Sequence, residues 1–222
     1  MCDECERELH DKANRRFEYP FITCVSCGPR FSIIKNLPYD RKNSSMDEFV
    51  MCEECKEEYE NPKDRRYHAQ PIGCHKCGPK LSLFDNSGAK IESNNLIDEV
   101  ISAISEGKIV AIKGIGGYHL LCDASNDSAV TLLRERKKRP SKPFGVMVKD
   151  IDTSKHIAHI SEKEQTLLSS NRRPIVLLQK RDENLLSRYV APNINQIGLF
   201  LAYTPLHPVS YTHLTLPTKR IV

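Results

Sequence analysis

The chain has 222 residues, enough for one large domain or two small ones, and its content of 39% hydrophobic and 28% charged residues excludes a fully disordered chain. Its formal net charge of +4 is too small to indicate a nucleic-acid partner by itself. No apolar run approaches the roughly 20 residues that cross a bilayer. The acidic start Met1–Cys5 is unlike a secretory signal peptide, so we expect a cytoplasmic protein with no membrane partner.

Eight of the nine cysteines lie in the first 77 residues and form an internal repeat. Each repeat reads C-x2-C-x18-C-x2-C, and the second copy starts fifty residues after the first. The repeated cysteines are Cys2, Cys5, Cys24, Cys27, Cys52, Cys55, Cys74 and Cys77. The similarity extends beyond them, because Arg15-Arg16 matches Arg65-Arg66. We therefore expect a duplicated, zinc-ribbon-like finger module over residues 1–85.

The spacing indicates two structural zinc ions. Two C-x-x-C turns place four thiolates around one metal at about 2.3 Å and leave no position for water. A disulfide framework is less compatible with a reducing compartment, and iron–sulfur clusters usually use other spacings. Ligation within each repeat is the first choice, and crossed pairing between repeats stays open. We expect Gly28 and Gly78 to adopt positive φ and to free backbone N–H groups for the sulfurs.

From Asn95 onward, helical and strand patterns alternate. A turn-rich stretch at 85–88 marks the boundary. Helices are expected at 96–106, 127–138 and from a capping box at Ser161, and strands at 108–113, 118–122, 145–149, 174–180 and 197–203. This order predicts a mixed-sheet α/β domain over residues 91–208, and hence an α+β or α/β class for the whole chain.

A glycine-rich turn lies between the first two of these strands. The segment Lys113-Gly-Ile-Gly-Gly-Tyr118-His119 contains three glycines, which permit close approach of the backbone to a ligand such as a phosphate. It is neither a Walker A sequence nor a dinucleotide fingerprint. A turn without a ligand remains the alternative.

A basic segment follows the helix at 127–138. Six cations occur in the nine residues 134–142, among them Lys137, Arg139 and Lys142. A solvated helix end is one interpretation, because cations suit the negative end of the helix dipole. Prolines at 140 and 143 stiffen the segment and favour the other interpretation, a rigid set of phosphate-binding cations.

Cys122 is the ninth cysteine and has no second cysteine nearby in the sequence. It sits among apolar residues of an expected strand. A buried structural thiol is therefore favoured over a nucleophile.

Several motifs together resemble the HypF family of [NiFe]-hydrogenase maturation carbamoyltransferases. In the cysteine half they are Cys24-x-x-Cys-Gly-Pro-Arg-Phe-Ser-Ile, Leu37-Pro-Tyr-Asp-Arg and Asp64-Arg-Arg-Tyr-His-Ala-Gln-Pro. In the second half they are Lys113-Gly-x-Gly-Gly-Tyr-His-Leu, Leu133-Arg-Glu-Arg-Lys-Lys-Arg-Pro-x-Lys-Pro-Phe and Tyr203-Thr-Pro-Leu-His, which are similar to a YrdC-like domain. The resemblance covers residues 2–207.

This resemblance implies a carbamoyl-adenylate-forming YrdC-like domain that uses ATP and carbamate derived from carbamoyl phosphate. The carbamoyl group would then pass to a cysteine of the partner HypE, on the way to the cyanide ligands of the hydrogenase iron. By the match, Lys137, Arg139 and Lys142 bind nucleotide, while Lys113, Tyr118 and His119 are catalytic. Magnesium is expected to arrive with the ATP.

The resemblance also implies that the chain is a fragment. Acylphosphatase-like and Kae1-like domains of the family are not represented, and residues 209–222 resemble a translated adaptor rather than a native end. We expect weak or no activity from this part alone. Two alternatives are a double-stranded RNA-binding YrdC-like domain and an inactive scaffold between catalytic domains.

Overall fold

The computed structural model describes residues 1–114 and 117–207. The chain divides into two compact units, one of Met1–Leu96 with a short segment starting at Thr204, and one built on Ile97–Tyr203.

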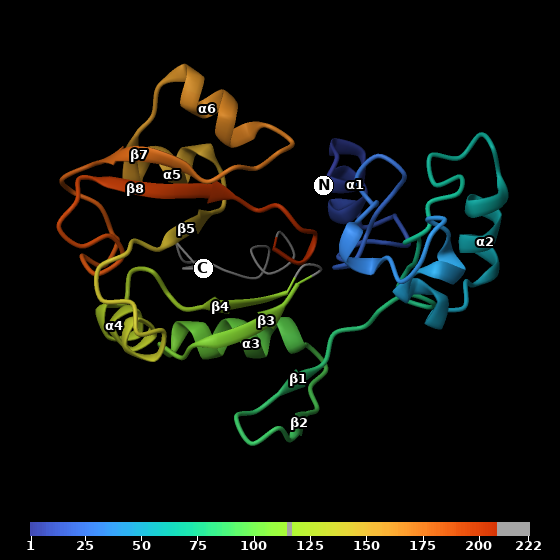
Figure 1. Cartoon of the computed structure of the whole chain (residues 1–222), viewed down its shortest axis with the longest axis horizontal. Helices are drawn as coiled ribbons and strands as arrows, with labels where there is room; N and C mark the ends of the chain where they lie inside the picture. Colours follow the sequence, from blue (N-terminus) through green and yellow to red (C-terminus); the bar gives the residue numbers. More distant parts are fainter. Residues whose placement is uncertain (115–116, 208–222) are drawn as a thin grey trace. The chain divides into compact units, whose positions relative to one another are not determined.

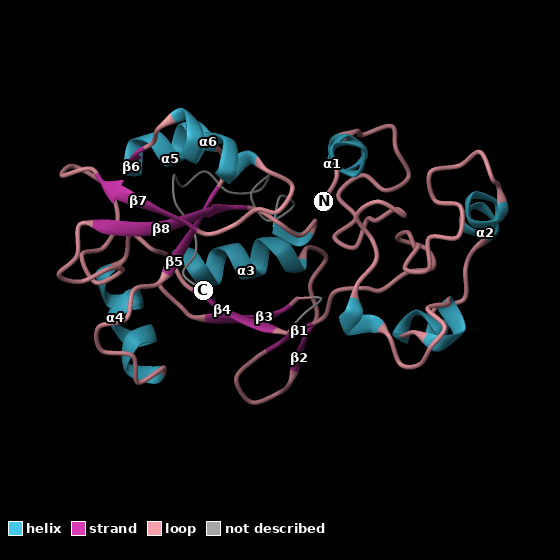
Figure 2. Cartoon of the chain, turned by 45° about the horizontal axis from the view of Figure 1, so that its top comes forward, coloured by secondary structure: helices cyan, strands magenta, loops and turns pink. Residues whose placement is uncertain are grey.

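The first unit consists mainly of loops that carry two short helices, α1 and α2 (Figure 1, Figure 2). Its regular elements are α1 (Asp3–His10), α2 (Glu53–Glu60), the 3-10 turns Phe31–Ile33, Arg41–Asn43 and Ser45–Glu48, and the antiparallel pair β1 (Leu83–Phe84) and β2 (Lys90–Ile91). The β1–β2 pair encloses the turn that the sequence indicated at 85–88, and Gly88 adopts a φ of 87° there. Neither α1 nor α2 was among the predicted helices.

The two cysteine repeats share one fold, as their sequences predicted. Each helix begins directly after the first cysteine of its repeat. In each repeat the chain then turns through a residue of positive φ, Glu18 at 54° and its counterpart His68 at 52°. The N–H of Glu18 donates to the carbonyl of Leu9, and the N–H of His68 donates to that of Tyr59. Equivalent hydrogen bonds therefore close both fingers.

The second unit contains a four-stranded mixed sheet. Its elements in chain order are α3 (Leu96–Ser105), β3 (Val110–Lys113), β4 (Tyr118–Leu121), α4 (Asp127–Arg136), β5 (Gly145–Val148), α5 (Ile151–Ile157), β6 (Ala158–His159), α6 (Glu162–Ser169), β7 (Val176–Lys180) and β8 (Gln196–Leu201). The strand order is β5-β8-β7-β6, with β5 parallel to β8 and the other pairs antiparallel. Helices α5 and α6 lie together against this sheet (Figure 1).

The mixed sheet and the helices that begin at Leu96, Asp127 and Glu162 confirm the predicted α/β pattern. Asn126 caps α4, since its side chain accepts a hydrogen bond from the N–H of Ala129. Three details differ from the prediction. β3 and β4 form a separate antiparallel hairpin, β8 ends at Leu201, and α5 with β6 was not predicted.

Alternation along the strands gives the sheet two unlike faces. Val146 and Val148 of β5 point into the main core, as do alternate residues of β8 and the buried side chains of α4, α5 and α6. Met147 and Phe200 pack together on the other face with Tyr203. That second face also contains two glycines, Gly145 and Gly198, which are direct partners in the parallel pair.

In the described parts of the chain, we find no helix with the length and apolar character needed to cross a membrane.

Candidate metal centres and candidate nucleotide site

The four cysteine sulfurs of the first repeat form one cluster. The Sγ atoms of Cys2, Cys5, Cys24 and Cys27 all lie within 4.8 Å of one another. The Cys2–Cys24, Cys24–Cys27 and Cys5–Cys27 separations are 3.6, 3.8 and 3.6 Å. A tetrahedron with metal–sulfur bonds of about 2.3 Å has edges of about 3.8 Å. The donor set therefore fits one zinc ion held by four thiolates.

The second repeat forms an equivalent cluster from Cys52, Cys55, Cys74 and Cys77. Here Cys52–Cys74 and Cys74–Cys77 are 3.7 and 3.8 Å apart. Each cluster draws on one repeat alone, so the grouping of the cysteines agrees with ligation within each repeat and not with crossed pairing. All nine cysteines lie in the described residues and none forms a disulfide. The alternative of a disulfide framework is therefore wrong.

The expected positive φ of Gly28 and Gly78 is wrong, although backbone N–H groups of neighbouring residues do hydrogen-bond the sulfurs of Cys24 and Cys74. Neither glycine is among the described residues with positive φ, and their N–H groups donate to the carbonyls of Cys24 and Cys74 rather than to sulfur. The physical reason for glycine is close packing. A Cβ at position 28 would lie 2.2 Å from Oγ1 of Thr23 and 2.4 Å from the carbonyl oxygen of Cys24.

Paired arginines connect each metal centre to the opposite finger. Arg15 of the first finger directs both terminal nitrogens at Cys55 Sγ, at 3.4 and 3.3 Å, and also donates to Glu58. Arg65 of the second finger directs the same two nitrogens at Cys5 Sγ, again at 3.4 and 3.3 Å. The repeat of these arginines was visible in the sequence, but their action on the other finger was not predicted.

A more deeply buried arginine follows each of these two. Arg16 is 1% exposed, forms a 2.5 Å ion pair with Glu58 and donates from Nε to the carbonyl of Gly73. Arg66 is 4% exposed and pairs with Glu8. Its Nε donates to the carbonyl of Thr23.

Electrostatics keep these pairs ionised. Burial alone would raise the pKa of Glu58, but hydrogen bonds from Arg16 and Arg15 outweigh it and hold that pKa below its usual value. The same balance lowers the pKa of Glu8 beside Arg66 and Arg65. Both carboxylates therefore remain charged at neutral pH.

The β3–β4 hairpin carries the three predicted catalytic residues but divides them between its two faces, since Lys113 pairs with Tyr118 and the next pair along the hairpin is Ile112 with His119. Lys113 and Tyr118 are direct partners across the hairpin, and the Lys113 ammonium lies 5.9 Å from the centre of the Tyr118 ring. The Tyr203 hydroxyl lies 3.3 Å from Nε2 of His119. Residues 115 and 116 of the glycine-rich turn lie outside the described residues.

Tyr203 is a candidate site residue that sequence reasoning did not assign. It follows β8 by two positions and reaches back across 84 residues to His119. Phe200 supports it from the second face of the sheet, with ring centres 6.1 Å apart. The motif around Tyr203 was noted in the sequence, but nothing local in it indicates a partner on the hairpin.

The basic segment divides into exposed and packed cations. Lys137 and Lys142 are exposed. Arg139 is turned onto its own segment, where it donates to the carbonyls of Lys142 and Pro143 and lies 5.1 Å from the centre of the Phe144 ring. These contacts hold the Arg139 side chain against protein atoms.

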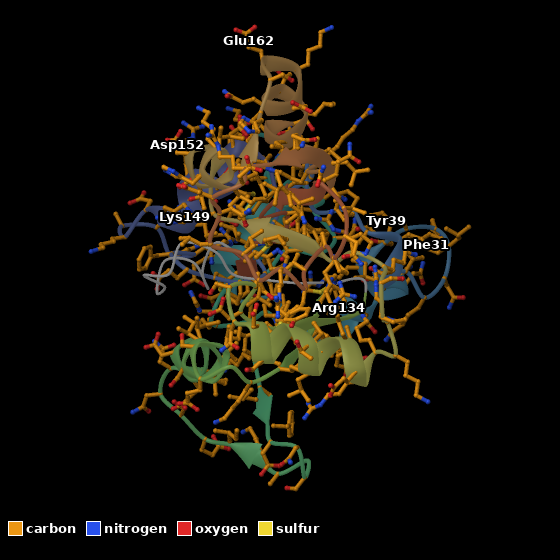
Figure 3. All side chains as sticks on the ribbon, turned by 90° about the vertical axis from the view of Figure 1, so that its left-hand side faces the viewer. Phe31, Tyr39, Arg134, Lys149, Asp152 and Glu162 are labelled. Carbon is orange, nitrogen blue, oxygen red and sulfur yellow. The ribbon has the colours of Figure 1, made fainter. Side chains whose placement is uncertain are left out.

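Arg134 was not predicted as a structural residue. It projects from α4 (Figure 3), is 7% exposed, and lies 4.6 Å from the centre of the Phe144 ring. It donates to the carbonyls of Tyr189, Val190 and Arg139, at 2.5, 3.1 and 2.7 Å. These bonds join α4 to the segment that follows it and to the connection between β7 and β8. An arginine among six clustered cations carries no sequence signal for burial.

Cys122 is fully buried in the main core beside Ala124 and Val130. Burial raises the pKa of its thiol to about 12, with a further contribution from the charge of Asp123. The expected structural thiol agrees with this position.

These features define a protein with tandem four-cysteine fingers followed by a mixed-sheet α/β domain. The chain belongs to the Sua5/YciO/YrdC family, described as telomere recombination, whose family model matches residues 102–215. A second model, the HypF finger, matches residues 1–34 and 51–84. Fingers and YrdC-like domain together correspond to a fragment of HypF.

Curated relatives carry the same combination. Carbamoyltransferase HypF of Rhizobium leguminosarum bv. viciae is 54% identical over 206 residues, which is 93% of this chain and 25% of that protein. Probable carbamoyltransferase HypF of Methanocaldococcus jannaschii is 50% identical over 209 residues, or 93% of this chain and 27% of that protein. The chain thus spans about a quarter of the length of these relatives.

Solved HypF structures match the whole chain. The crystal structure of T. kodakarensis HypF gives a TM-score of 0.94 at 45% identity and covers 100% of this chain and 29% of that one. A structure of full-length HypF in the phosphate- and nucleotide-bound form gives 0.91 at the same identity and coverage.

Proposed function

We propose that this chain is the carbamate-activating part of a HypF-type carbamoyltransferase of [NiFe]-hydrogenase maturation. One observation carries the proposal: fingers and YrdC-like domain occur in one chain in the order found in HypF proteins, at 54% identity to one of them. The nucleotide-bound state of a HypF structure supports a nucleotide ligand for the corresponding domain here.

The proposed reaction joins carbamate to AMP. A carbamate oxygen attacks the α-phosphorus of ATP, the bond to the β-phosphate oxygen breaks, and pyrophosphate leaves with Mg²⁺. The carbamate comes from hydrolysis of carbamoyl phosphate, in which water is consumed and inorganic phosphate leaves. Cations that neutralise the departing pyrophosphate accelerate such a step. The exposed ammonium groups of Lys137 and Lys142 are the proposed partners of these phosphates, with Arg139 shaping the segment that presents them.

The second face of the sheet is the proposed floor of the site. Gly145 and Gly198 are direct partners there, and the side chain of Ile175 packs over both of them. His119 and Tyr203 supply hydrogen-bonding groups from the hairpin and the end of β8. Lys113 supplies a cation beside Tyr118 on the other face of the hairpin. In the proposed mechanism His119 and Tyr203 orient the carbamate, and the carbamoyl group then passes to a HypE-type acceptor.

The test is ATP–pyrophosphate exchange by the full chain, supplied either with ammonium carbamate or with carbamoyl phosphate. Exchange that depends on carbamate is expected, and carbamate should support it better than carbamoyl phosphate. Lys137→Ala and Lys142→Ala should each weaken nucleotide binding by about one to two decades, the worth of a charge-assisted contact. Lys163→Ala, which removes an exposed lysine from α6, is the matched control.

Two results would contradict the proposal. The first is exchange and nucleotide binding that are unchanged in both lysine variants. The second is salt-sensitive retention of double-stranded RNA that ATP does not alter, in a chain without exchange activity. That second result would favour the RNA-binding alternative.

A further inference from the structure

The arginine pairs Arg15-Arg16 and Arg65-Arg66 connect the two fingers reciprocally. Each pair leaves its own finger and reaches the helix of the other one, α1 or α2. On each helix the second cysteine of the cluster and a glutamate are three positions apart, Cys5 with Glu8 and Cys55 with Glu58, so they share one face. The opposite finger's arginines bind that face.

From this reciprocity we propose that each finger supplies the outer shell of the other finger's metal centre. Arg15 is a positioning residue for the cluster of the second repeat, and Arg65 for the cluster of the first. The two centres then form one coupled unit, in which neither finger holds its metal at full affinity without the other.

Charge explains why the arginines would matter. One zinc ion with four thiolates carries a formal charge of −2. Guanidinium groups at 3.3 and 3.4 Å from Cys5 and Cys55 reduce that charge locally and restrict the orientation of the sulfur. These contacts run between the fingers. Arg15 of the first finger acts on Cys55 of the second, and Arg65 of the second finger acts on Cys5 of the first.

The second arginine of each pair is buried. Ion pairs at the surface contribute little to stability, and this arrangement differs from them. The side chains of Arg16 and Arg66 are only 2% and 4% exposed. Their Nε atoms also donate to backbone carbonyls of the opposite finger, at Gly73 and Thr23, each directly before a ligand cysteine. The arginines therefore fix the loop that carries the third ligand as well as the sulfur of the second.

The experiment uses the full chain loaded with cadmium-113, a probe with one resonance per tetrathiolate site. Couplings to the cysteine Hβ protons assign each resonance to its repeat. Arg65→Ala should shift the resonance of the first repeat and leave the second in place, and Arg15→Ala should do the reverse. Release of cadmium to a chelator should accelerate about 10–100-fold at the shifted site, the usual effect of removing an outer-shell partner.

Lys76→Ala is the matched control. It removes a cation adjacent to Cys77 whose recorded ion pair is with Glu54, at 3.7 Å. It should leave both resonances and both release rates unchanged. Arg65→Lys and Arg15→Lys retain the charge without the forked geometry, and are used if either alanine variant fails to fold.

The outcome is decided by which resonance moves. A shift confined to the finger that carries the substituted arginine would overturn the proposal. So would unchanged release rates in both alanine variants, or a shift of both resonances in Lys76→Ala as large as in the arginine variants.

Discussion

The Tyr19 side chain of the first finger packs directly on Gly78 of the second. A Cβ at position 78 would lie 1.9 Å from the Tyr19 hydroxyl oxygen and 3.0 Å from Cζ of that ring. Tyr19 is itself 2% exposed, and its hydroxyl donates to the carbonyl of Pro79. The glycine that follows the last cysteine of the second repeat is therefore determined by a residue of the first repeat.

Gly78→Ala should destabilise the finger unit by about 3 kcal/mol, because neither the buried ring nor the backbone can move aside without breaking contacts. Thermal unfolding of the zinc-loaded chain measures this. The double variant Tyr19→Phe with Gly78→Ala should recover part of the loss, since the nearest clashing atom is removed. Equal stability of Gly78→Ala and the unsubstituted chain would contradict the packing.

The zinc content of the chain is expected to be two ions. In Cys74→Ser it should fall to one or less, because a structural site of this kind supplies much of the folding free energy of its module. The α/β unit should keep its own unfolding transition, since the residues of its main core fall between Cys122 and Leu201, with packing from Ile109 and Leu120. Elemental analysis and calorimetry measure the two expectations.

One or no zinc in the reduced, unsubstituted chain would refute the two-site prediction. Loss of the α/β transition in Cys74→Ser would refute the independence of its core. Lys80→Ala, an exposed change in the same finger, is the control for both measurements.

The cysteine spacing was enough to predict two four-sulfur clusters, because each knuckle is a local turn. Partners distant in sequence were not predictable in this way. Arg15 acts on Cys55, 40 residues away, and nothing near either residue specifies that contact. The same limit applies to Tyr203 and His119, which come together only when β8 and the hairpin have formed.

The two helices of the finger unit, α1 and α2, were not predicted from the sequence. Helices α1 and α2 have eight residues each, too few to be stable through propensity alone. Both begin immediately after a ligand cysteine and contain the next one, so metal binding and the arginine contacts organise them. In the second unit, by contrast, α3 shows apolar spacing that a sequence can reveal, and Gly107 ends it at a φ of 79°.

Substitutions of Arg139 and of Lys137 in the basic segment should have different effects on stability. Arg139→Ala removes hydrogen bonds to two carbonyls and the contact with Phe144, so we expect a loss of about 1–3 kcal/mol of stability. Lys137→Ala removes only an exposed side chain after α4 and should leave the melting temperature unchanged. Thermal unfolding without nucleotide measures both, and equal stability of the two variants would refute the assignment of Arg139 to packing.

Cys122 should resist alkylation in the native chain. Its pKa of about 12 leaves almost no thiolate at pH 8, and its side chain is fully buried. Because the folded pKa lies above the unfolded value of about 8.5, the thiol's contribution to stability is complete below pH 8.5 and is lost as the pH rises toward 12. Iodoacetamide labelling of the zinc-loaded chain, read by peptide mass spectrometry, should therefore leave Cys122 unmodified at pH 8 and label it in denaturant. Rapid labelling of Cys122 in the native chain would show that its thiol is open to solvent, and Cys122 would again be a candidate nucleophile.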